Sequence, residues 1–322
     1  MRRALVSSLL LVLVASAAVA QVTEELSVSY VMIPFTVLGS RGVPITNLNE
    51  REVSLFIDGR PVRSDMFEKS LNAPVSWTIL VDGSGSMGLA GKLESARAAV
   101  STLVSRRRAG DDFSLFVFAE GRAHEIVPFT SDPAPILRAL DKLEPYGKTA
   151  FFDALADIPE RSQAGANGTR AILLLSDGID NNSQLTRPEI AKLLEGVAVP
   201  IYAIGLREPG EFTKDKPAES SSDLTLLGEL ATLTGGKLYV GNRPAQLGRA
   251  LDGIEQELRA QYLIGFSPTG KGAVKYRRIS LKLAGRVHSV RVRAGYRGTE
   301  PPVVSASASR GKKPNNERKG SR

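Results

Sequence analysis

Between residues 75 and 260, short apolar segments alternate with longer amphipathic ones, and this alternation constrains the fold more than any other feature. Ala171 to Leu175 and Val199 to Gly205 are nearly continuous aliphatic runs, typical of strands buried on both faces of a sheet. Leu89 to Arg107 instead has the apolar spacing of an amphipathic helix. Strands that alternate with helices indicate parallel βαβ units. We therefore predict an α/β domain of three layers around a central, mostly parallel sheet.

The segments on either side of this region have the pattern of strands without helices. Residues 21–70 contain two strand-like segments, Ser27 to Val37 and Val53 to Ile57. Residues 261–298 contain three more. Because neither set forms a sheet large enough to be stable alone, we predict that the two meet in one small β-sandwich-like module. The α/β domain, residues 75–260, is then inserted between them.

The first twenty residues have the pattern of a cleavable signal peptide. Two arginines are followed by an almost unbroken apolar run, Ala4 to Val14, and then by the small residues Ala18 to Ala20. This order predicts cleavage before Gln21 and a periplasmic or secreted protein. The apolar run is short for a membrane span, and no later stretch approaches about 18 apolar residues, so we expect no transmembrane segment in the mature chain.

Charge and composition exclude several classes of function. The formal net charge is +8, but most of it comes from the N-terminal arginines and from a basic tail, residues 299–322, whose composition predicts disorder. The rest of the chain is near neutral, so we expect no nucleic-acid partner. The chain has no cysteine and two histidines, His124 and His288, which we interpret as surface or structural residues. A disulfide framework and a catalytic zinc site are therefore disfavoured.

The loop that follows the strand Trp77 to Val81 offers a carboxylate and two hydroxyls in alternation. These side chains are Asp82, Ser84 and Ser86, and glycines separate them. In an open parallel sheet, such a loop lies outside the carboxyl end of its strand, where ligands bind. Alternating side chains can converge on one point, and hard oxygen ligands suit Mg²⁺, Mn²⁺ or Ca²⁺.

Two further oxygen donors come from loops that we expect at the same edge of the sheet. Asp177 follows the aliphatic strand Ala171 to Leu175, and Thr149 precedes a predicted helix. In this position and chain order, the donors resemble the metal-ion-dependent adhesion site of the von Willebrand factor A family. The resemblance covers about residues 75–260.

The resemblance implies a Rossmann-like von Willebrand factor A fold and a particular division of roles. The hydroxyls of Ser84, Ser86 and Thr149 would bind a divalent cation, Mg²⁺ or else Mn²⁺ or Ca²⁺, directly. The carboxylates of Asp82 and Asp177 would bind it directly or through water. One coordination position would stay open for an acidic residue of a partner protein. The chain would thus be an exported bacterial adhesion or protein-binding module, and not an enzyme.

The flanking segments are similar to the extensions of A-domain-related proteins from acidobacteria. Asp58 to Pro61, Gln261 to Phe266 and Val290 to Tyr296 carry this narrower resemblance. One residue departs from the family pattern, because Lys148 stands where many members have glycine. An ammonium pointing inward there would weaken divalent binding by Coulomb repulsion, whereas a lysine stem on a loop can also turn to solvent.

Other readings of the same residues stay open at this point. Gly83, Gly85 and Gly88 also match the spacing of a dinucleotide-binding loop. However, Asp82 would repel the pyrophosphate, and no acid follows about 20 residues later. A scaffold that keeps the motif but not the cation is a further alternative. Ser84 and Ser86 lie outside a nucleophile-elbow pattern, which disfavours a hydrolase.

Overall fold

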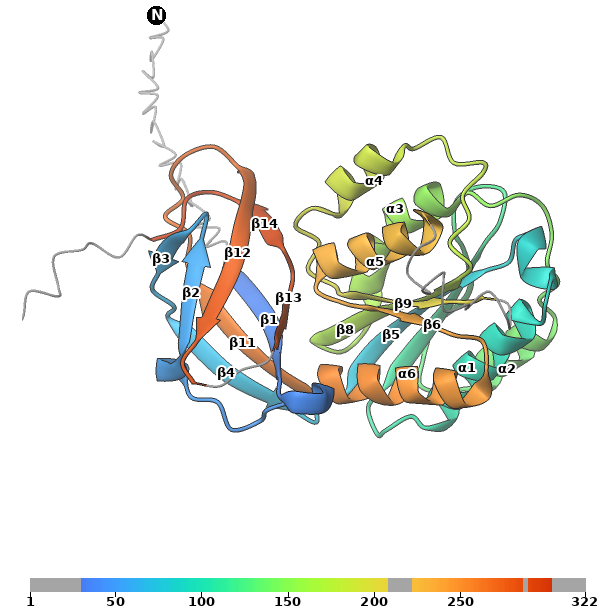
Figure 1. Cartoon of the computed structure of the whole chain (residues 1–322), viewed down its shortest axis with the longest axis horizontal. Coiled ribbons are helices and arrows are strands. Elements are labelled where there is room, and N and C mark those ends of the chain that lie inside the picture. The colour runs from blue at the N-terminus through green and yellow to red at the C-terminus, as the bar shows by residue number, and fades with distance from the viewer. Residues whose placement is uncertain (1–29, 208–221, 286–288, 303–322) are drawn as a thin grey trace, which may run out of the picture.

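The computed structural model describes residues 30–207, 222–285 and 289–302, which form two domains lying side by side (Figure 1). One domain has helices on both sides of a sheet, and the other consists of strands. The predicted signal peptide, His288 and residues 303–322 of the predicted tail lie outside the described residues.

The described part of the α/β domain contains a six-stranded sheet with the order β10-β9-β8-β5-β6-β7. Every neighbouring pair is parallel except β6 and β7, which are antiparallel. This confirms the predicted central, mostly parallel sheet. The strands are β5 (Val75–Asp82), β6 (Asp112–Phe118), β7 (His124–Thr130), β8 (Thr169–Ser176), β9 (Ile201–Gly205) and β10 (Leu238–Val240).

Helices cover both faces of this sheet, which explains why its central strands are aliphatic throughout. In β8, Leu173 belongs to the apolar cluster on one face, and Ile172 belongs to the cluster on the other. The first face is covered by α1 (Lys92–Ser105), α2 (Ala134–Asp141) and α6 (Pro244–Leu258). The second face is covered by α3 (Phe151–Arg161), α4 (Arg187–Leu194) and α5 (Ser222–Thr234).

The second domain is a sandwich of two four-stranded sheets, with the orders β13-β1-β11-β4 and β14-β12-β2-β3. The N-terminal strand β1 pairs with β11 and β13, and β2 pairs with β12, so both ends of the described chain contribute to each sheet. This confirms the predicted β-sandwich-like module. The strands are β1 (Val31–Leu38), β2 (Val53–Ile57), β3 (Arg60–Val62), β4 (Met66–Leu71), β11 (Ala260–Phe266), β12 (Lys275–Leu283), β13 (Ser289–Val292) and β14 (Gly295–Gly298).

One apolar core lies between the two sheets of the sandwich. Phe35 of β1 stacks on Tyr262 of β11, with ring centroids 5.4 Å apart, and Leu55 of β2 and Ile279 of β12 contribute from the opposite sheet. The strands β3, β4 and β14 were not predicted from the sequence. Short 3-10 helices complete the described chain: η1 (Ser40–Gly42), η2 (Glu50–Glu52), η3 (Gly85–Gly88) and η4 (Ser162–Ala164).

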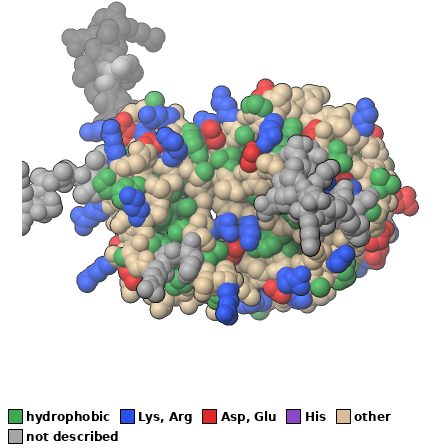
Figure 2. All heavy atoms as spheres, viewed as in Figure 1, with side chains coloured by type: hydrophobic (Ala, Val, Ile, Leu, Met, Phe, Trp, Pro, Cys, Tyr) green, Lys and Arg blue, Asp and Glu red, His purple; other side chains and the backbone are tan. Residues whose placement is uncertain are grey.

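The surface carries both signs of charge on both domains. Figure 2 shows Lys and Arg side chains scattered over one face of the molecule and interspersed with acidic side chains. This mixture differs from the continuous basic stripe of a typical nucleic-acid-binding face. Within the described residues, none of the helices combines the length and the apolar character needed to cross a membrane.

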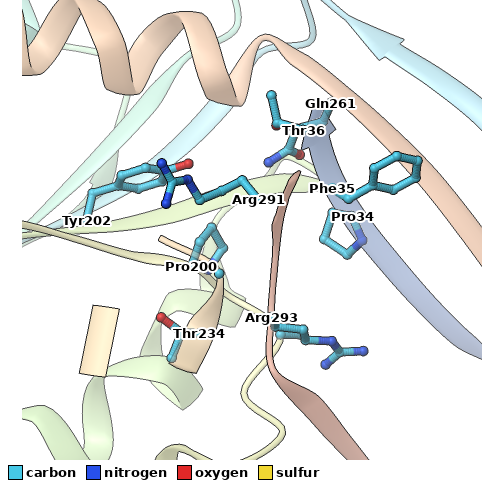
Figure 3. A pocket seen from close by; sticks show the side chains of 11 residues that line it. Pro34, Phe35, Thr36, Pro200, Tyr202, Thr234, Gln261, Arg291 and Arg293 are labelled. Carbon is cyan, nitrogen blue, oxygen red and sulfur yellow. The ribbon is translucent and has the colours of Figure 1, made fainter. Parts of the chain in front are cut away.

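The strand β13 and the segment after it make polar contacts with the α/β domain. Figure 3 shows Arg291 and Arg293 from this part of the chain near Tyr202 and Thr234. Arg293, on the segment after β13, is buried and donates to the carbonyl oxygens of Gly196 (3.1 Å) and Met32 (3.0 Å). The Nε of Arg291 lies 3.2 Å from a carboxylate oxygen of Glu257, which is also buried. The segment after β13 passes so close to Gly235 that a Cβ at position 235 would lie 2.7 Å from the backbone nitrogen of Arg293. The two domains therefore pack closely at Gly235, beside a small pocket that residues of both domains line, among them Tyr202 and Arg291 (Figure 3).

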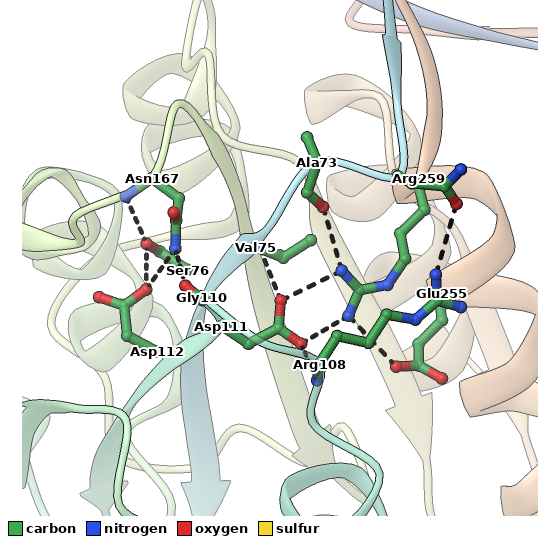
Figure 4. Close-up of polar contacts among 11 residues, drawn as sticks. Ala73, Val75, Ser76, Arg108, Gly110, Asp111, Asp112, Asn167, Glu255 and Arg259 are labelled. Carbon is green, nitrogen blue, oxygen red and sulfur yellow. Dashed lines mark hydrogen bonds and ion pairs between the residues drawn. The ribbon is translucent and has the colours of Figure 1, made fainter.

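A buried ion pair closes the place where the α/β domain is inserted into the sandwich (Figure 4). Arg259, just after α6, makes two hydrogen bonds to Asp111, of 2.6 and 3.1 Å, and a third to the carbonyl of Ala73 at 3.0 Å. Ala73 lies on the connector that enters the α/β domain, so one side chain joins the entry and the exit of the insertion. The amino end of β5 therefore faces the sandwich, and the carboxyl ends of the parallel strands point away from it.

Candidate metal site at the outer edge of the parallel sheet

The loop after β5 is held in a tight conformation at the outer edge of the sheet. The backbone nitrogen of Gly83 donates to the carbonyl of Phe118 at 2.7 Å, and a Cβ at position 83 would lie 2.8 Å from Val117. Glycine is therefore required here by close packing against β6. The turn places Ser84 so that its backbone nitrogen donates to Oδ1 of Asp82 at 3.0 Å. The hydroxyl oxygens of Ser84 and Ser86 lie 3.1 Å apart.

The loop after β8 brings the second carboxylate beside the first. Because β5 and β8 are parallel neighbours, Ser176 lies next to Asp82, and its hydroxyl donates to Oδ2 of Asp82 at 2.7 Å. Asp177 follows directly and is buried, with 3% of its surface exposed. Its Oδ1 accepts a hydrogen bond from the backbone nitrogen of Ile179 at 3.3 Å. The two predicted aspartates are therefore close together at one end of the sheet.

Thr149 reaches the same place from the loop before α3. It is buried, its backbone nitrogen donates to the side chain of Asn181 at 2.9 Å, and its carbonyl accepts from Asn181 and Asn182 at 3.0 Å each. The neighbouring Gly147 accepts a hydrogen bond of 3.0 Å from Gly85. These contacts join the Thr149 loop to the loops after β5 and β8. The structure thus brings the three loops that carry Asp82, Ser84, Ser86, Thr149 and Asp177 to one edge of the sheet.

The two carboxylates share a poorly solvated environment. The pKa of Asp82 is raised to about 6, mainly by burial and to a smaller extent by the charge of Asp177. Hydrogen bonds from Ser176 and from Ser84 lower it but do not cancel the effect of burial. A buried carboxylate with this environment is stabilised by a neighbouring cation. At Asp82, burial therefore outweighs the hydrogen bonds that favour the charged carboxylate.

The buried lysine of the site is Lys92, a residue that the sequence analysis did not single out. The Nζ of Lys92 lies 2.7 Å from Oδ2 of Asp177, and only 10% of the Lys92 side chain is exposed. Lys148, which departs from the family pattern, is exposed to solvent. A signal for Lys92 existed in the sequence, because the first turn of a helix normally favours acidic residues and disfavours lysine. The predicted helix start at Leu89 obscured it, since α1 begins only at Lys92, after Ala90 and Gly91 in left-handed conformations.

The donor set suits a hard divalent cation. Within the described residues, no group of three or more His, Cys, Asp or Glu side chains could hold a metal ion. A cation at this edge would therefore depend on hydroxyl oxygens in addition to the two carboxylates. Oxygen donors of this kind fit Mg²⁺, Mn²⁺ or Ca²⁺. The close hydroxyls of Ser84 and Ser86 and the negative charge of the aspartates are the observations that make these residues fit such an ion.

The geometry is less suited to a dinucleotide. A pyrophosphate is bound by the amino terminus of a helix that begins directly after the glycine-rich turn. Here the turn leads into the 3-10 helix η3, and the first residue of α1 is the cationic Lys92, whose ammonium is already paired with Asp177. Asp82 lies at the start of the turn and is fully buried.

Comparison with known proteins finds a family match within the α/β domain. Residues 78–179 match the family model of the von Willebrand factor type A domain. An uncharacterised protein from Borreliella burgdorferi is 25% identical over 190 residues, which cover 53% of this chain and 55% of that protein. The match therefore spans about half the length of this relative.

Two solved structures are similar to parts of this chain. A von Willebrand factor type A protein from Catenulispora acidiphila is 16% identical and matches with a TM-score of 0.48, covering 77% of this chain and 76% of that one. The conserved hypothetical protein BatB from Bacteroides thetaiotaomicron is 24% identical, with a TM-score of 0.45, covering 58% of this chain and all of that one. Within the α/β domain, residues 78–179 thus match the sequence pattern of a von Willebrand factor type A domain.

Proposed function

We propose that this protein binds an acidic residue of a partner protein through a divalent cation, and that it carries out no chemical reaction. The cation, Mg²⁺ or else Mn²⁺ or Ca²⁺, would be held by Asp82, Ser84, Ser86, Thr149 and Asp177. The observation that carries the proposal is the meeting of two buried carboxylates and two close hydroxyls at the edge that faces away from the β-sandwich.

The charges of the site explain why the partner group would be acidic. Asp82 and Asp177 carry two negative charges when ionised, and Lys92 contributes one positive charge. With a divalent cation the sum becomes positive by one. A carboxylate from a partner would neutralise this charge, whereas a neutral or cationic group would leave it unbalanced in a poorly solvated place.

Apolar side chains flank the loop and would contact the partner around its acidic residue. Leu89 is 60% exposed and its backbone nitrogen donates to Ser86, while Tyr146 is 54% exposed and its backbone nitrogen donates to Gly83. Both side chains therefore project from segments that are hydrogen-bonded to the candidate site. Tyrosine is enriched among the residues that dominate binding energy at protein interfaces, which favours Tyr146 as a contact.

Cation binding is tested by calorimetry and thermal unfolding of the purified chain. Titration of metal-free protein with Mg²⁺ or Mn²⁺ should give one site, and the midpoint of unfolding should rise with cation concentration and return on addition of EDTA. At 100 times the dissociation constant, the gain should be about 2.7 kcal/mol. An absence of both heat and thermal shift, for Mg²⁺ and Mn²⁺ alike, contradicts the proposal.

That result would instead favour a second function, a scaffold that has kept the motif without the cation. The ion pair between Lys92 and Asp177 supports this alternative, because it satisfies one of the carboxylates from within the chain.

Partner binding should depend on the cation and on the flanking apolar residues. A pull-down from the envelope fraction of the host should recover a protein with Mg²⁺ present and lose it in EDTA. For that partner, we expect Leu89→Ala combined with Tyr146→Ala to weaken binding at least tenfold while Mg²⁺ affinity stays within threefold of the wild type. The exposed Leu193, on α4, supplies a control as Leu193→Ala. Equal binding by the double variant and the control would show that this surface is not the contact.

The N-terminal pattern supports export of the protein. Residues 1–20 combine a basic start, an apolar run and a small-residue cleavage pattern, and we propose that they direct the chain to the periplasm or the medium. Mass spectrometry of the mature protein from the host would identify its first residue, which should be Gln21.

A further inference from the structure

Lys92 occupies an unusual position for a lysine. It is the first residue of α1, where the helix dipole disfavours a cation, and 92% of its surface is buried. A buried ammonium is costly unless an anion lies close. The carboxylate of Asp177 meets this requirement at 2.7 Å, so the placement of Lys92 depends on an aspartate that belongs to the candidate metal site.

We propose that Lys92 is a built-in counter-ion that competes with the divalent cation for Asp177 and keeps the cation affinity of the site low. This inference rests on the proposed function, and it identifies how that site is regulated. The ammonium acts in two ways. It takes up Oδ2 of Asp177 by a direct hydrogen bond, and it repels any second cation placed among the same carboxylates.

The competition has a consequence for how the protein would work. In the absence of the cation, Lys92 balances one of the two buried carboxylates, so the loops can keep their arrangement. With the cation present, the same ammonium leaves the site positive by one charge. Binding of the cation and binding of an acidic group should therefore support each other, because the acidic group removes the repulsion that Lys92 introduces.

The exposed Lys148 provides a matched control for this idea. Lys92 follows the loop that carries Asp82, and Lys148 directly precedes Thr149. The difference is that Lys148 is exposed and Lys92 is buried. Water and salt screen a charge on the surface, whereas a buried charge is screened much less. Removing the charge of Lys92 should therefore change the affinity for a cation much more than removing that of Lys148.

The test is calorimetric titration of the full chain with Mn²⁺ and with Mg²⁺. Lys92→Gln keeps a side chain that can donate to Asp177 but removes the charge, and we expect it to bind at least tenfold more tightly than the wild type. Lys148→Gln should stay within threefold of the wild type. In EDTA, Lys92→Gln should unfold at a lower temperature than the wild type, and Mn²⁺ should reverse this difference. Lys92→Arg keeps the charge, so it should bind the cation no more tightly than the wild type even if the glutamine variant fails to fold.

The outcomes separate this inference from the proposed function. If the wild type binds and Lys92→Gln binds equally or more weakly, the role of Lys92 is wrong and the cation site stands. Tighter binding by Lys92→Arg likewise overturns it. If the wild type shows no binding heat and Lys92→Gln binds the cation, the lysine takes the place of the cation in the natural chain. That result supports the inference and contradicts the proposed function. If no variant binds, both are wrong.

Discussion

Replacing Arg259 by methionine should lower the free energy of unfolding by about 3–5 kcal/mol. Methionine fills a similar volume but leaves the carboxylate of Asp111 without a cation, and Asp111 is 2% exposed. The loss includes two hydrogen bonds to Asp111 and the one to the carbonyl of Ala73. Breaking a buried ion pair from one side is far more costly than breaking an exposed one, because the remaining charge cannot reach water.

The electrostatics of Asp111 support this size of effect. Burial alone would raise the pKa of the Asp111 carboxyl, but hydrogen bonds from Arg259 and from the backbone of Arg108 and Val75, with the charge of Arg259, hold it below its ordinary value. A lowered pKa means that the pair stabilises the fold above about pH 4, and that this contribution is lost as the pH falls through the pKa of the folded state. The difference in stability between the wild type and Arg259→Met should therefore become smaller in acid.

Urea unfolding followed by fluorescence measures the effect, because the single tryptophan, Trp77, lies buried in β5. Arg106→Met is the matched control, since its ion pair with Asp252 has the same 2.6 Å distance but is about half exposed. We expect that control to change stability by less than about 1 kcal/mol. Adding Asp111→Asn to Arg259→Met should recover part of the loss. An Arg259→Met chain as stable as the control would show that the ion pair at the insertion point contributes little to the stability of the fold.

The ion pair of Arg259 also marks a limit of sequence-based prediction. Asp111 and Arg259 are 148 positions apart, and their types and neighbours give no sign of the pairing. The predicted elements that proved correct depend on local patterns. β2 has the predicted bounds because Val53 to Ile57 alternates, and β8 was found because aliphatic strands between helices are distinctive. β4 was missed because Met66 to Leu71 contains two charged residues and has no regular alternation.

The meeting of the site residues could be predicted for a topological reason. The carboxyl ends of neighbouring parallel strands meet at one edge of a sheet, so Asp82 after β5 and Asp177 after β8 had to lie near each other once the strands were neighbours. The role of Lys92 could not be predicted in the same way. Its contact with Asp177 depends on where α1 begins, and helix boundaries are the least certain part of a sequence-based prediction.

Replacing Asp82 by asparagine should have opposite effects on stability in the absence and in the presence of a divalent cation. In EDTA at pH 8, we expect the variant to be more stable than the wild type by up to about 3 kcal/mol, since a change of one pKa unit corresponds to about 1.4 kcal/mol. The reason is the buried charge, which raises the pKa of Asp82 to about 6 from the ordinary 3.8. Asparagine keeps the size of the side chain and removes that charge.

The sign of the pH dependence follows from the same values. The carboxyl of Asp82 holds its proton to a higher pH in the folded chain than in the unfolded chain. Its contribution to stability is therefore fully present below about pH 4 and is lost as the pH rises through about 6. In EDTA, the advantage of Asp82→Asn should be small at pH 4 and nearly complete at pH 8.

Addition of Mg²⁺ or Mn²⁺ at pH 8 should then make the wild type more stable than Asp82→Asn. The wild type gains stability from the cation, whereas the variant lacks one of the two carboxylates and should bind at least a hundredfold more weakly. Glu120→Gln is the matched control, because Glu120 packs against Gly147 beside the site but is exposed, and it should follow the wild type in both buffers. A variant that is less stable than the wild type in EDTA at pH 8 would mean that hydrogen bonds from Ser84 and Ser176 outweigh the burial of the charge. A variant that gains as much from the cation as the wild type would remove Asp82 from the proposed site. The expected result would mean that the Asp82 carboxylate destabilises the cation-free fold and stabilises the cation-bound one, as a ligand of the proposed cation should.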